Sequence, residues 1–171
     1  MLNLFETPRL AIRMMTPEDA PFILQLFNAP TWLQFLGDRN VRTLEDARAY
    51  ITDIYLKNHT DNGYGAYLVT LRDSGEPIGI CGLFRRPYLP VPDLGYSLLP
   101  AFEGKGYAFE AASATMDYVG SHLGKTELRA IVSEANTRSV RLLEKLGFVF
   151  MEKVQPPGEE RMVLVYDVNL S

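Results

Sequence analysis

Apolar and polar residues follow two different periods along this chain, one typical of strands and one typical of helices. In RLAIRMM (residues 9–15) every second residue is large and apolar, which predicts a half-buried strand. The other segments predicted as strands are 64–71, 77–84, 94–99, 127–133, 148–154 and 161–170. The first two of these flank a short polar segment, RDSGE, and are predicted to form a hairpin.

Four segments carry helical signals. Thr16 is followed by proline and two acids, which predicts an N-cap and a helix to about Phe27. Thr43 starts a similar signal for a helix to about Lys57. Its expected buried face is Ala47, Tyr50, Ile51 and Ile54. The third helix is predicted over 107–122 and the fourth over 137–146, where Gly147 ends it.

The order of these elements, β-α-α-β-β-β-α-β-α-β-β, predicts an α/β fold with a mixed sheet. A length of 171 residues fits a single domain spanning 1–171. Between the first two helices, Trp32 and Phe35 either line a substrate entrance or pack beneath the sheet. The segment 85–93 contains three prolines and cannot form an interior strand.

Composition narrows the classes of partner. The chain has 17 Lys+Arg against 21 Asp+Glu, a net charge of −4, and this argues against nucleic acid as a partner. It has neither a secretory signal pattern nor a long apolar run, so we expect a cytoplasmic protein without membrane contact. The single cysteine, Cys81, cannot form an internal disulfide and is expected to be an inert core thiol. The two histidines offer no zinc spacing, so no metal is expected.

One turn between a strand and a helix carries chemical meaning. Glycines in the segment 103–108, EGKGYA, let the backbone approach an anion at the start of a helix. The segment fails as a Walker loop because Gly106 follows Lys105 where Ser or Thr is needed. It fails as a dinucleotide fingerprint because Phe109 stands where a third glycine is needed. A plain structural turn remains an alternative.

The same segment resembles the coenzyme A pyrophosphate loop of the GCN5-related N-acetyltransferase (GNAT) superfamily, Gln/Arg-x-x-Gly-x-Gly/Ala, with Glu103 in the first position. The segment 136–148, NTRSVRLLEKLGF, resembles the Asn-x-x-Ser…Glu-Lys-x-Gly-Phe segment of that family. Weaker similarities are ETPRL at 6–10 and DLGYSLLP at 93–100. Together these segments cover most of the chain in the expected order, and they look most like the RimJ/RimL branch.

The resemblance implies a GNAT-like α/β fold, with a mixed, mostly antiparallel sheet of about seven strands and about four helices. It also implies an acetyl-CoA-dependent N-acetyltransferase. A primary amine, either a protein N-terminus or a small molecule, would attack the thioester directly in a ternary complex. A catalytically silent acyl-CoA-binding or sensor domain is the alternative. The final strands could pair between subunits of a homodimer.

The resemblance further assigns the site residues. Those expected to bind the coenzyme are Leu98, Leu99, Gly104, Lys105, Gly106, Tyr107, Ala108, Phe109, Asn136, Ser139 and Arg141. The candidate catalytic residues are Asp93 as general base and Ser139 as proton donor to the leaving thiolate, with Glu134 as a reserve base. Arg138 and Arg141 either meet the ribose phosphate or belong to a solvated helix face.

The free energy needed to deprotonate the acceptor amine differs between kinds of amine. Removing a proton at neutral pH costs about 4–5 kcal/mol for a lysine-like amine and about 1 kcal/mol for an α-amine. An ordinary carboxylate such as Asp93 is therefore better matched to a peptide N-terminus than to a lysine side chain.

Overall fold

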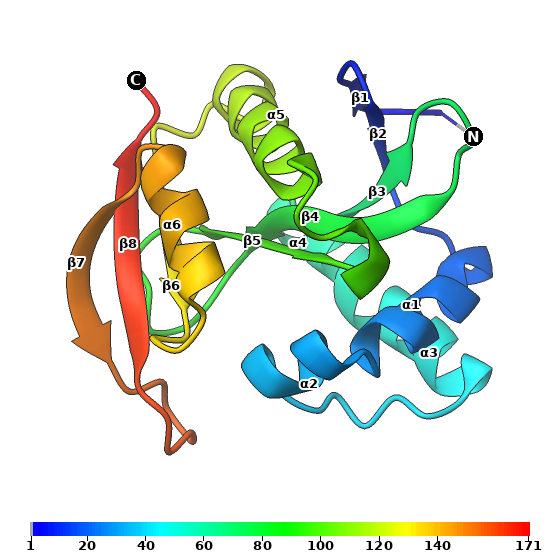
Figure 1. The fold of residues 1–171 in the computed structure, drawn as a ribbon, viewed down its shortest axis with the longest axis horizontal. Coiled ribbons are helices and arrows are strands. Elements are labelled where there is room, and N and C mark those ends of the chain that lie inside the picture. Colours follow the sequence, from blue (N-terminus) through cyan, green and yellow to red (C-terminus); the bar gives the residue numbers. More distant parts are fainter. Residues whose placement is uncertain (1) are drawn as a thin grey trace.

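The computed structural model describes residues 2–171 and arranges them around one eight-stranded sheet (Figure 1). The strands are β1 (Phe5–Glu6), β2 (Leu10–Arg13), β3 (Ala66–Leu71), β4 (Pro77–Phe84), β5 (Asp93–Leu98), β6 (Glu127–Val132), β7 (Val149–Val154) and β8 (Val163–Asn169). They lie in the order β1-β2-β3-β4-β5-β6-β8-β7, and among them only β5 and β6 are parallel neighbours. The predicted mixed, mostly antiparallel sheet is confirmed, with the two-residue β1 added at one edge.

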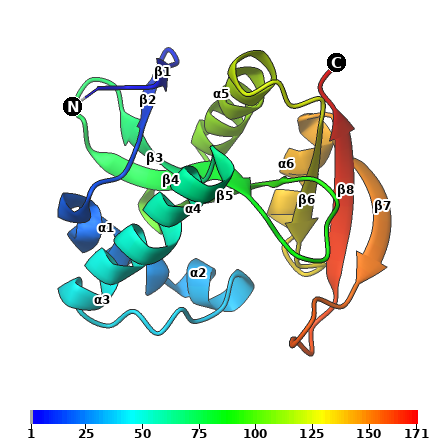
Figure 2. The same ribbon diagram turned by 180° about the vertical axis from the view of Figure 1, so that it is seen from behind.

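Helices cover both faces of the sheet (Figures 1 and 2). They are α1 (Ala20–Phe27), α2 (Pro30–Phe35), α3 (Leu44–Tyr50), a π-helical stretch (Ile51–Leu56), α4 (Lys57–Asn62), α5 (Tyr107–His122) and α6 (Thr137–Lys145). The helices α1 to α4 lie on one face, and α5 and α6 lie on the other. Each face has its own apolar core. Among residues 2–171, no helix has the length and apolarity needed to cross a membrane.

The first helical region follows the prediction and adds one short helix. The apolar face of α1 is buried as expected, with Ile23 and Leu26 fully enclosed. The helix α1 ends at Phe27, and Pro30 is the first residue of α2, a position where its missing N–H costs nothing. Trp32 in α2 is only 4% exposed and stacks on Phe27 at 4.4 Å between ring centroids. Trp32 therefore belongs to the core, whereas Phe35 is partly exposed.

The second predicted helix differs from expectation in its inner face. It continues to Asn62 and contains a π-helical stretch, whose wider turns rotate the residues that follow. Tyr55 is consequently buried at 4% exposure, while Ile54 is 41% exposed. The prediction that Ile54 lies on the buried face is wrong because it assumed 3.6 residues per turn throughout.

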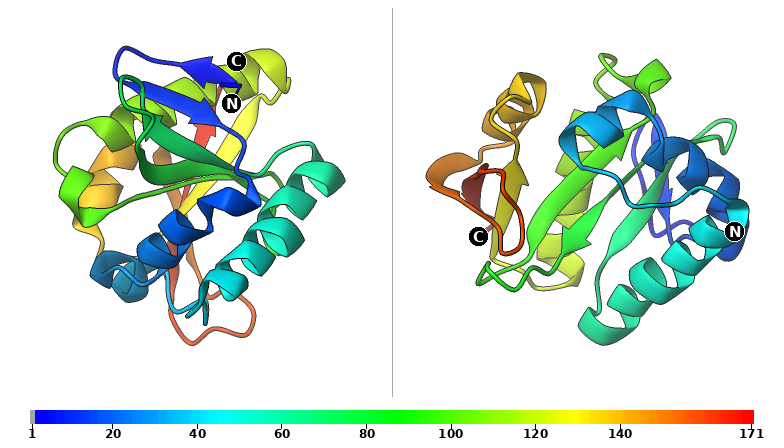
Figure 3. Two further views of the ribbon diagram at one scale, coloured as in Figure 1. Left: turned by 90° about the vertical axis from the view of Figure 1, so that its right-hand side faces the viewer. Right: turned by 90° about the horizontal axis from the view of Figure 1, so that it is seen from below.

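The sheet opens between its two parallel strands. β4 and β5 pair along six residues, from Asp93 to Leu98 on β5. β5 and β6, in contrast, pair only at Asp93 and Arg129. Beyond that pair the two strands diverge, so that β6, β7 and β8 stand apart from the rest of the sheet (Figure 3, right). Main-chain groups on this edge of β5 are left without a strand partner, and such groups need another one.

Candidate active site

A cleft of about 670 Å³ occupies the opening between β5 and β6. One end is lined by the segment from Glu103 to Phe109 and by the first turn of α6. The other end is lined by α2 with the residues after it, by Arg86, and by Arg161 and Val163 at the start of β8. The volume lies in the range of small-molecule sites. We call these the loop end and the far end of the cleft.

The glycine loop at the loop end has a backbone that only glycine adopts readily. Gly104 has φ 75° and Gly106 has φ 84°, both in the left-handed region. Gly106 is also the N-cap of α5. The loop therefore leads the chain directly into the first turn of a 16-residue helix, where free N–H groups and the helix dipole favour an anion.

The motif near the N-terminus fixes this loop in place. The Arg9 Nη1 donates to the carbonyl of Lys105 at 2.9 Å, and its Nε donates to Glu110 Oε2 at 2.6 Å. The Thr7 hydroxyl donates to the same carboxylate at 2.6 Å. Burial raises the pKa of Glu110, but the hydrogen bonds from Thr7 and Arg9 outweigh it, and the net shift is downward. The segment ETPRL therefore positions the loop that resembles a pyrophosphate site.

The cleft gathers most of the residues predicted to bind the coenzyme. Those that line it are Leu98, Gly104, Gly106, Tyr107, Ala108, Phe109, Asn136, Ser139 and Arg141. Leu99 and Lys105 are not among its lining residues. Leu99 is buried in the core on the other face, and its N–H donates to the carbonyl of Ile78 at 2.8 Å. The Lys105 ammonium lies 5.9 Å from the Phe102 ring centroid.

A hydroxyl in the first turn of α6 is hydrogen-bonded to a hydroxyl from β5. Asn136 caps the helix, because its side-chain oxygen accepts the Ser139 N–H at 3.3 Å. The Ser139 Oγ lies 2.9 Å from the hydroxyl of Tyr96 on β5. Burial raises the pKa of Tyr96 to about 12, so this hydroxyl stays protonated at neutral pH. Ser139 therefore faces the cleft with a partner that holds its side chain.

Asp93 lies where the two strands begin to diverge. Its side chain is 1% exposed and lines the cleft, and one carboxylate oxygen accepts from the Arg86 Nε at 3.0 Å. Burial raises the pKa of Asp93 to about 6, even though Arg86 opposes that shift. A carboxylate with such a pKa is closer to the range suited to proton transfer near neutral pH than an exposed aspartate.

Side chains alternate between the two faces of β5, and this alternation separates the Asp93 carboxylate from the Tyr96–Ser139 hydroxyl pair. Asp93 and Tyr96 are three residues apart, so their side chains leave opposite faces of the strand. Tyr96 packs with the core beneath α5 and α6. The cleft thus has the hydroxyl pair on the α5–α6 side and the carboxylate on the other side, with the open edge of β5 between them.

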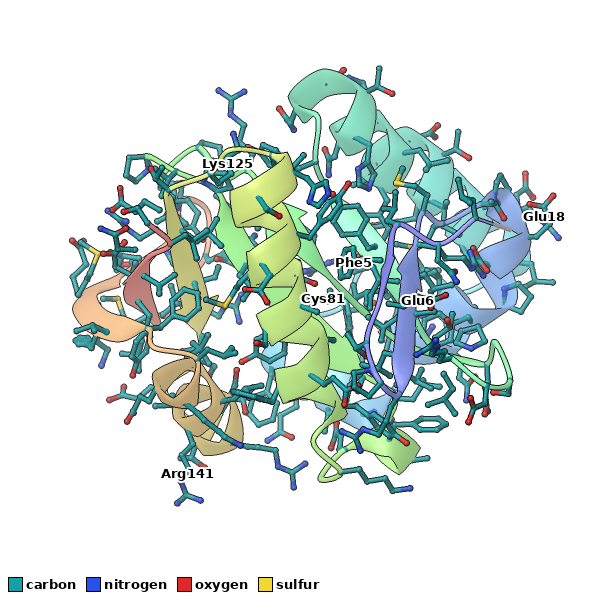
Figure 4. All side chains as sticks on the ribbon, turned by 90° about the horizontal axis from the view of Figure 1, so that it is seen from above. Phe5, Glu6, Glu18, Cys81, Lys125 and Arg141 are labelled. Carbon is teal, nitrogen blue, oxygen red and sulfur yellow. The ribbon has the colours of Figure 1, made fainter. Side chains whose placement is uncertain are left out.

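Other predicted residues lie in less suitable places. Glu134, the reserve base, is 65% exposed in its side chain and pairs with Lys153 at 2.8 Å. Arg138 pairs with Glu103 at 3.1 Å, across the loop end of the cleft. Arg141 projects from α6 toward solvent at the cleft edge (Figure 4). Cys81 is fully buried beneath α5, and burial raises the pKa of its thiol to about 12, which makes it a poor nucleophile.

Several cleft residues carry polar groups that the sequence did not single out as site residues. Among them are Arg39, Arg86, Tyr96 and Arg161. Tyr96 stands within the DLGYSLLP segment, and its even spacing from Leu94 and Leu98 could have placed it on their face of the strand. The three arginines come from three separate loops, and no local pattern links them.

Comparisons with known proteins agree with this geometry. Residues 9–149 match the family model described as "Acetyltransferase (GNAT) domain". An uncharacterized N-acetyltransferase, YoaA of Bacillus subtilis, is 30% identical over 154 residues, covering 86% of this chain and 84% of YoaA. The spermidine N(1)-acetyltransferase of Escherichia coli is 25% identical over 138 residues, covering 80% of this chain and 71% of that protein.

A solved structure extends the comparison to three dimensions. The structure of RimL, the ribosomal L7/L12 alpha-N-protein acetyltransferase in complex with coenzyme A, superimposes with a TM-score of 0.83 over 98% of each chain. At 19% identity this likeness shows the fold alone. The family match covers most of the chain. The chain belongs to the GNAT acetyltransferases.

Proposed function

We propose that this protein transfers the acetyl group of acetyl-CoA to a primary amine by direct attack in a ternary complex. The observation that carries the proposal is the cleft that joins a helix-capping glycine loop at one end to a buried Asp93 near the other. Loop N–H groups suit a pyrophosphate, and the open edge of β5 suits an amide-containing arm and the thioester carbonyl.

The proposed step balances in its protons. The amine nitrogen forms a bond to the thioester carbonyl carbon, and the carbon–sulfur bond breaks. The amine proton passes to Asp93, through water, and Asp93 then releases it to solvent; the leaving thiolate takes a proton from the Ser139 hydroxyl. Ser139 then recovers its proton along its hydrogen bond with Tyr96 and from solvent. The main chain near Leu98 polarises the carbonyl.

Acetyl-CoA binding by this chain is proposed to involve the residues that the structure brings together. These are Leu98, Gly104, Gly106, Tyr107, Ala108, Phe109, Asn136, Ser139 and Arg141. Their chemistry fits the cosubstrate, because the loop offers backbone donors and Asn136 keeps its amide N–H groups for a ligand. Leu99 and Lys105 stay predictions from the resemblance. Neither residue lines the cleft, so neither adds a hydrogen-bond donor to its lining.

A catalytically silent acyl-CoA-binding domain is the rival. The buried Asp93 favours an enzyme, because a carboxylate that costs free energy to bury is unnecessary for binding alone. The test measures thiol release from acetyl-CoA across a panel of primary amines. We expect turnover in the wild type and a loss of about 10²-fold or more in Asp93→Asn, since general-base catalysis contributes about 10²–10⁴. Acetyl-CoA stabilisation without turnover by any amine would support the silent domain.

The remaining proposals concern the context of the domain. We propose one acetyltransferase domain over 1–171, supported by the continuous eight-stranded sheet. The RimJ/RimL-like branch is supported by the segments ETPRL and DLGYSLLP, and a cytoplasmic location by the need for acetyl-CoA. A homodimer would use β7, an edge strand on which Val149, Phe150 and Met151 are 68%, 47% and 47% exposed. Gel filtration tests the last point.

A further inference from the structure

Three arginines gather at the far end of the cleft. Arg39 follows α2, Arg86 lies in the loop before β5, and Arg161 precedes β8. The Arg161 Nη1 donates to the carbonyl of Phe35 at 2.9 Å. The Arg39 Nη1 donates to the carbonyl of Leu36, the residue that follows Phe35, at 2.8 Å. Two of the guanidinium groups are therefore held against one turn of chain that itself lines the cleft.

Arg86 lines the same cleft as the other two arginines, and its Nε donates to Asp93 at 3.0 Å. Burial raises the pKa of Tyr55 well above its usual value, and both Arg39 and Arg86 act to lower it. Burial likewise raises the pKa of the half-buried Tyr88; Arg86 and Arg161 act to lower it, and Asp93 and Glu159 act to raise it. Arg86 thus lies within electrostatic reach of the groups that Arg39 and Arg161 also reach. The loop that carries Tyr88 extends over β6 toward β8 (Figure 2).

Two of these three arginines have an acidic partner, whereas Arg39 has none among the described residues. Asp93 is the acid that lines this end of the cleft, and it is already paired with Arg86. Glu159 lies 3.3 Å from Arg161 but is 41% exposed in its side chain and is not among the lining residues. Arg39 takes part in no ion pair among residues 2–171. Its guanidinium carbon lies 5.7 Å from the Trp32 ring centroid.

We infer that the amine acceptor also carries a carboxylate, which Arg39 and Arg161 bind while Asp93 accepts the proton of the amine. The inference rests on the acetyl-transfer function proposed above and specifies its substrate class. Guanidinium groups bind carboxylates through paired, charge-assisted hydrogen bonds. The three guanidinium groups outnumber the two carboxylates paired with them, Asp93 and Glu159, and this excess of positive charge disfavours polyamines, which are cations throughout. The carboxylate comes either from a free amino acid or from an acidic residue that follows a peptide N-terminus.

A charge series on one skeleton tests the inference. L-aspartate, L-asparagine and L-asparaginamide are compared as acceptors, with kcat/KM expressed per unprotonated amine. Spermidine and a tetrapeptide beginning Ser-Asp-Asp are added. We expect kcat/KM to fall at least tenfold from aspartate to asparaginamide and to be lowest for spermidine. Equal or better turnover of asparaginamide or spermidine overturns the inference and leaves the proposed function intact.

The peptide arm separates the two sources of carboxylate. If the acidic peptide exceeds aspartate, and a Ser-Asn-Asn tetrapeptide is poor, the carboxylate belongs to a protein N-terminus. If aspartate exceeds both peptides, it belongs to a free amino acid. No turnover with any amine contradicts the proposed function itself, and the inference falls with it.

Variants of the arginines supply the matched control. Arg39→Gln and Arg161→Gln should each raise KM for the carboxylate acceptor about tenfold while changing kcat less than about threefold, because a hydrogen bond to a charged group is lost. Arg39→Glu should shift the preference toward spermidine. Arg48→Gln, an exposed arginine of α3 outside the cleft, should change neither. Equal losses for aspartate and asparaginamide would assign the arginines a structural role and contradict the inference.

Discussion

Arg9 and Glu110 are 101 residues apart in the chain, yet the Arg9 Nε donates to Glu110 Oε2 at 2.6 Å and the Arg9 N–H donates to Glu110 Oε1 at 2.9 Å. The same guanidinium holds the carbonyl of Lys105. Its carbon lies 4.4 Å from the Tyr107 ring centroid. One side chain, from the residue just before β2, thereby ties the glycine loop and the first turn of α5 to the sheet.

Arg9→Gln is predicted to raise KM for acetyl-CoA more than it lowers kcat. The loss of charge-assisted hydrogen bonds frees the loop, and each such bond contributes about 1.5–3 kcal/mol when well enclosed. The partial exposure of Arg9 reduces that value, and a KM increase of roughly three- to tenfold follows. Steady-state kinetics with varied acetyl-CoA measure it, with Arg48→Gln as the control. A fall in kcat alone, at constant KM, would argue against a role in holding the loop.

Gly106→Ala is predicted to weaken both stability and acetyl-CoA binding. An alanine at φ 84° costs roughly 1–2 kcal/mol, and its Cβ would lie 3.2 Å from the Arg9 Nη2. Gly124→Ala is the matched control, because Gly124 has φ 65° with open space around its Cβ and lies outside the cleft. Both variants should melt at lower temperature, but only Gly106→Ala should lose affinity for acetyl-CoA. Equal affinity in the two variants would remove the loop from the binding site.

The pKa of Asp93, raised to about 6 by burial, predicts a pH dependence of activity. The carboxyl must lose its proton to act as a base, so kcat/KM should rise through pH 6 as the pH increases. Aspartate N-acetylation measured from pH 5 to 8 should show this limb in the wild type. Asp93→Asn should lack it and retain only the dependence due to the amine. A wild-type limb that survives in Asp93→Asn would mean that another group titrates.

The same pKa predicts the sign of a stability effect. A raised carboxyl pKa means that the native state holds a proton which the unfolded chain has lost between about pH 4 and 6. The contribution of Asp93 to the free energy of unfolding therefore falls as the pH rises through that window, by as much as about 3 kcal/mol. Urea unfolding at pH 4 and pH 7 measures how much the free energy of unfolding changes between these pH values, for the wild type and for Asp93→Asn. A wild-type advantage that grows with pH contradicts the burial argument.

Substitution of Glu103 is predicted to increase the affinity for acetyl-CoA. Its carboxylate occupies Arg138 at 3.1 Å and adds a negative charge at the loop end of the cleft. Glu103→Gln removes that charge and frees Arg138 for a phosphate, so KM for acetyl-CoA should fall about two- to fivefold, as expected for an exposed ion pair. Because salt screens such charges, the gain should shrink at high ionic strength. An unchanged KM at low salt would show that neither side chain meets the coenzyme.

Local features of this protein are readable from its sequence. The glycine loop, the Asn136 cap and the end of α6 at Gly147 depend on neighbouring residues alone, through positive φ and capping hydrogen bonds. The helix predicted over 107–122 is confirmed with the same bounds for that reason. The small net charge of −4 likewise argues against a nucleic-acid partner but not against a phosphorylated cosubstrate, because backbone N–H groups can bind an anion.

The tertiary structure alone decided the arrangement of the site. The strand order brings Arg39, Arg86 and Arg161 to one end of a cleft and sends Asp93 and Tyr96 to opposite sides of it. The opening itself exists because β5 and β6 pair at one position and then diverge. No short-range pattern encodes these relations, since each depends on how segments far apart in the chain pack across the sheet. The sequence by itself determined the local geometry of the glycine loop and the helix caps, and the packing decided which side chains from distant segments share the cleft with that loop.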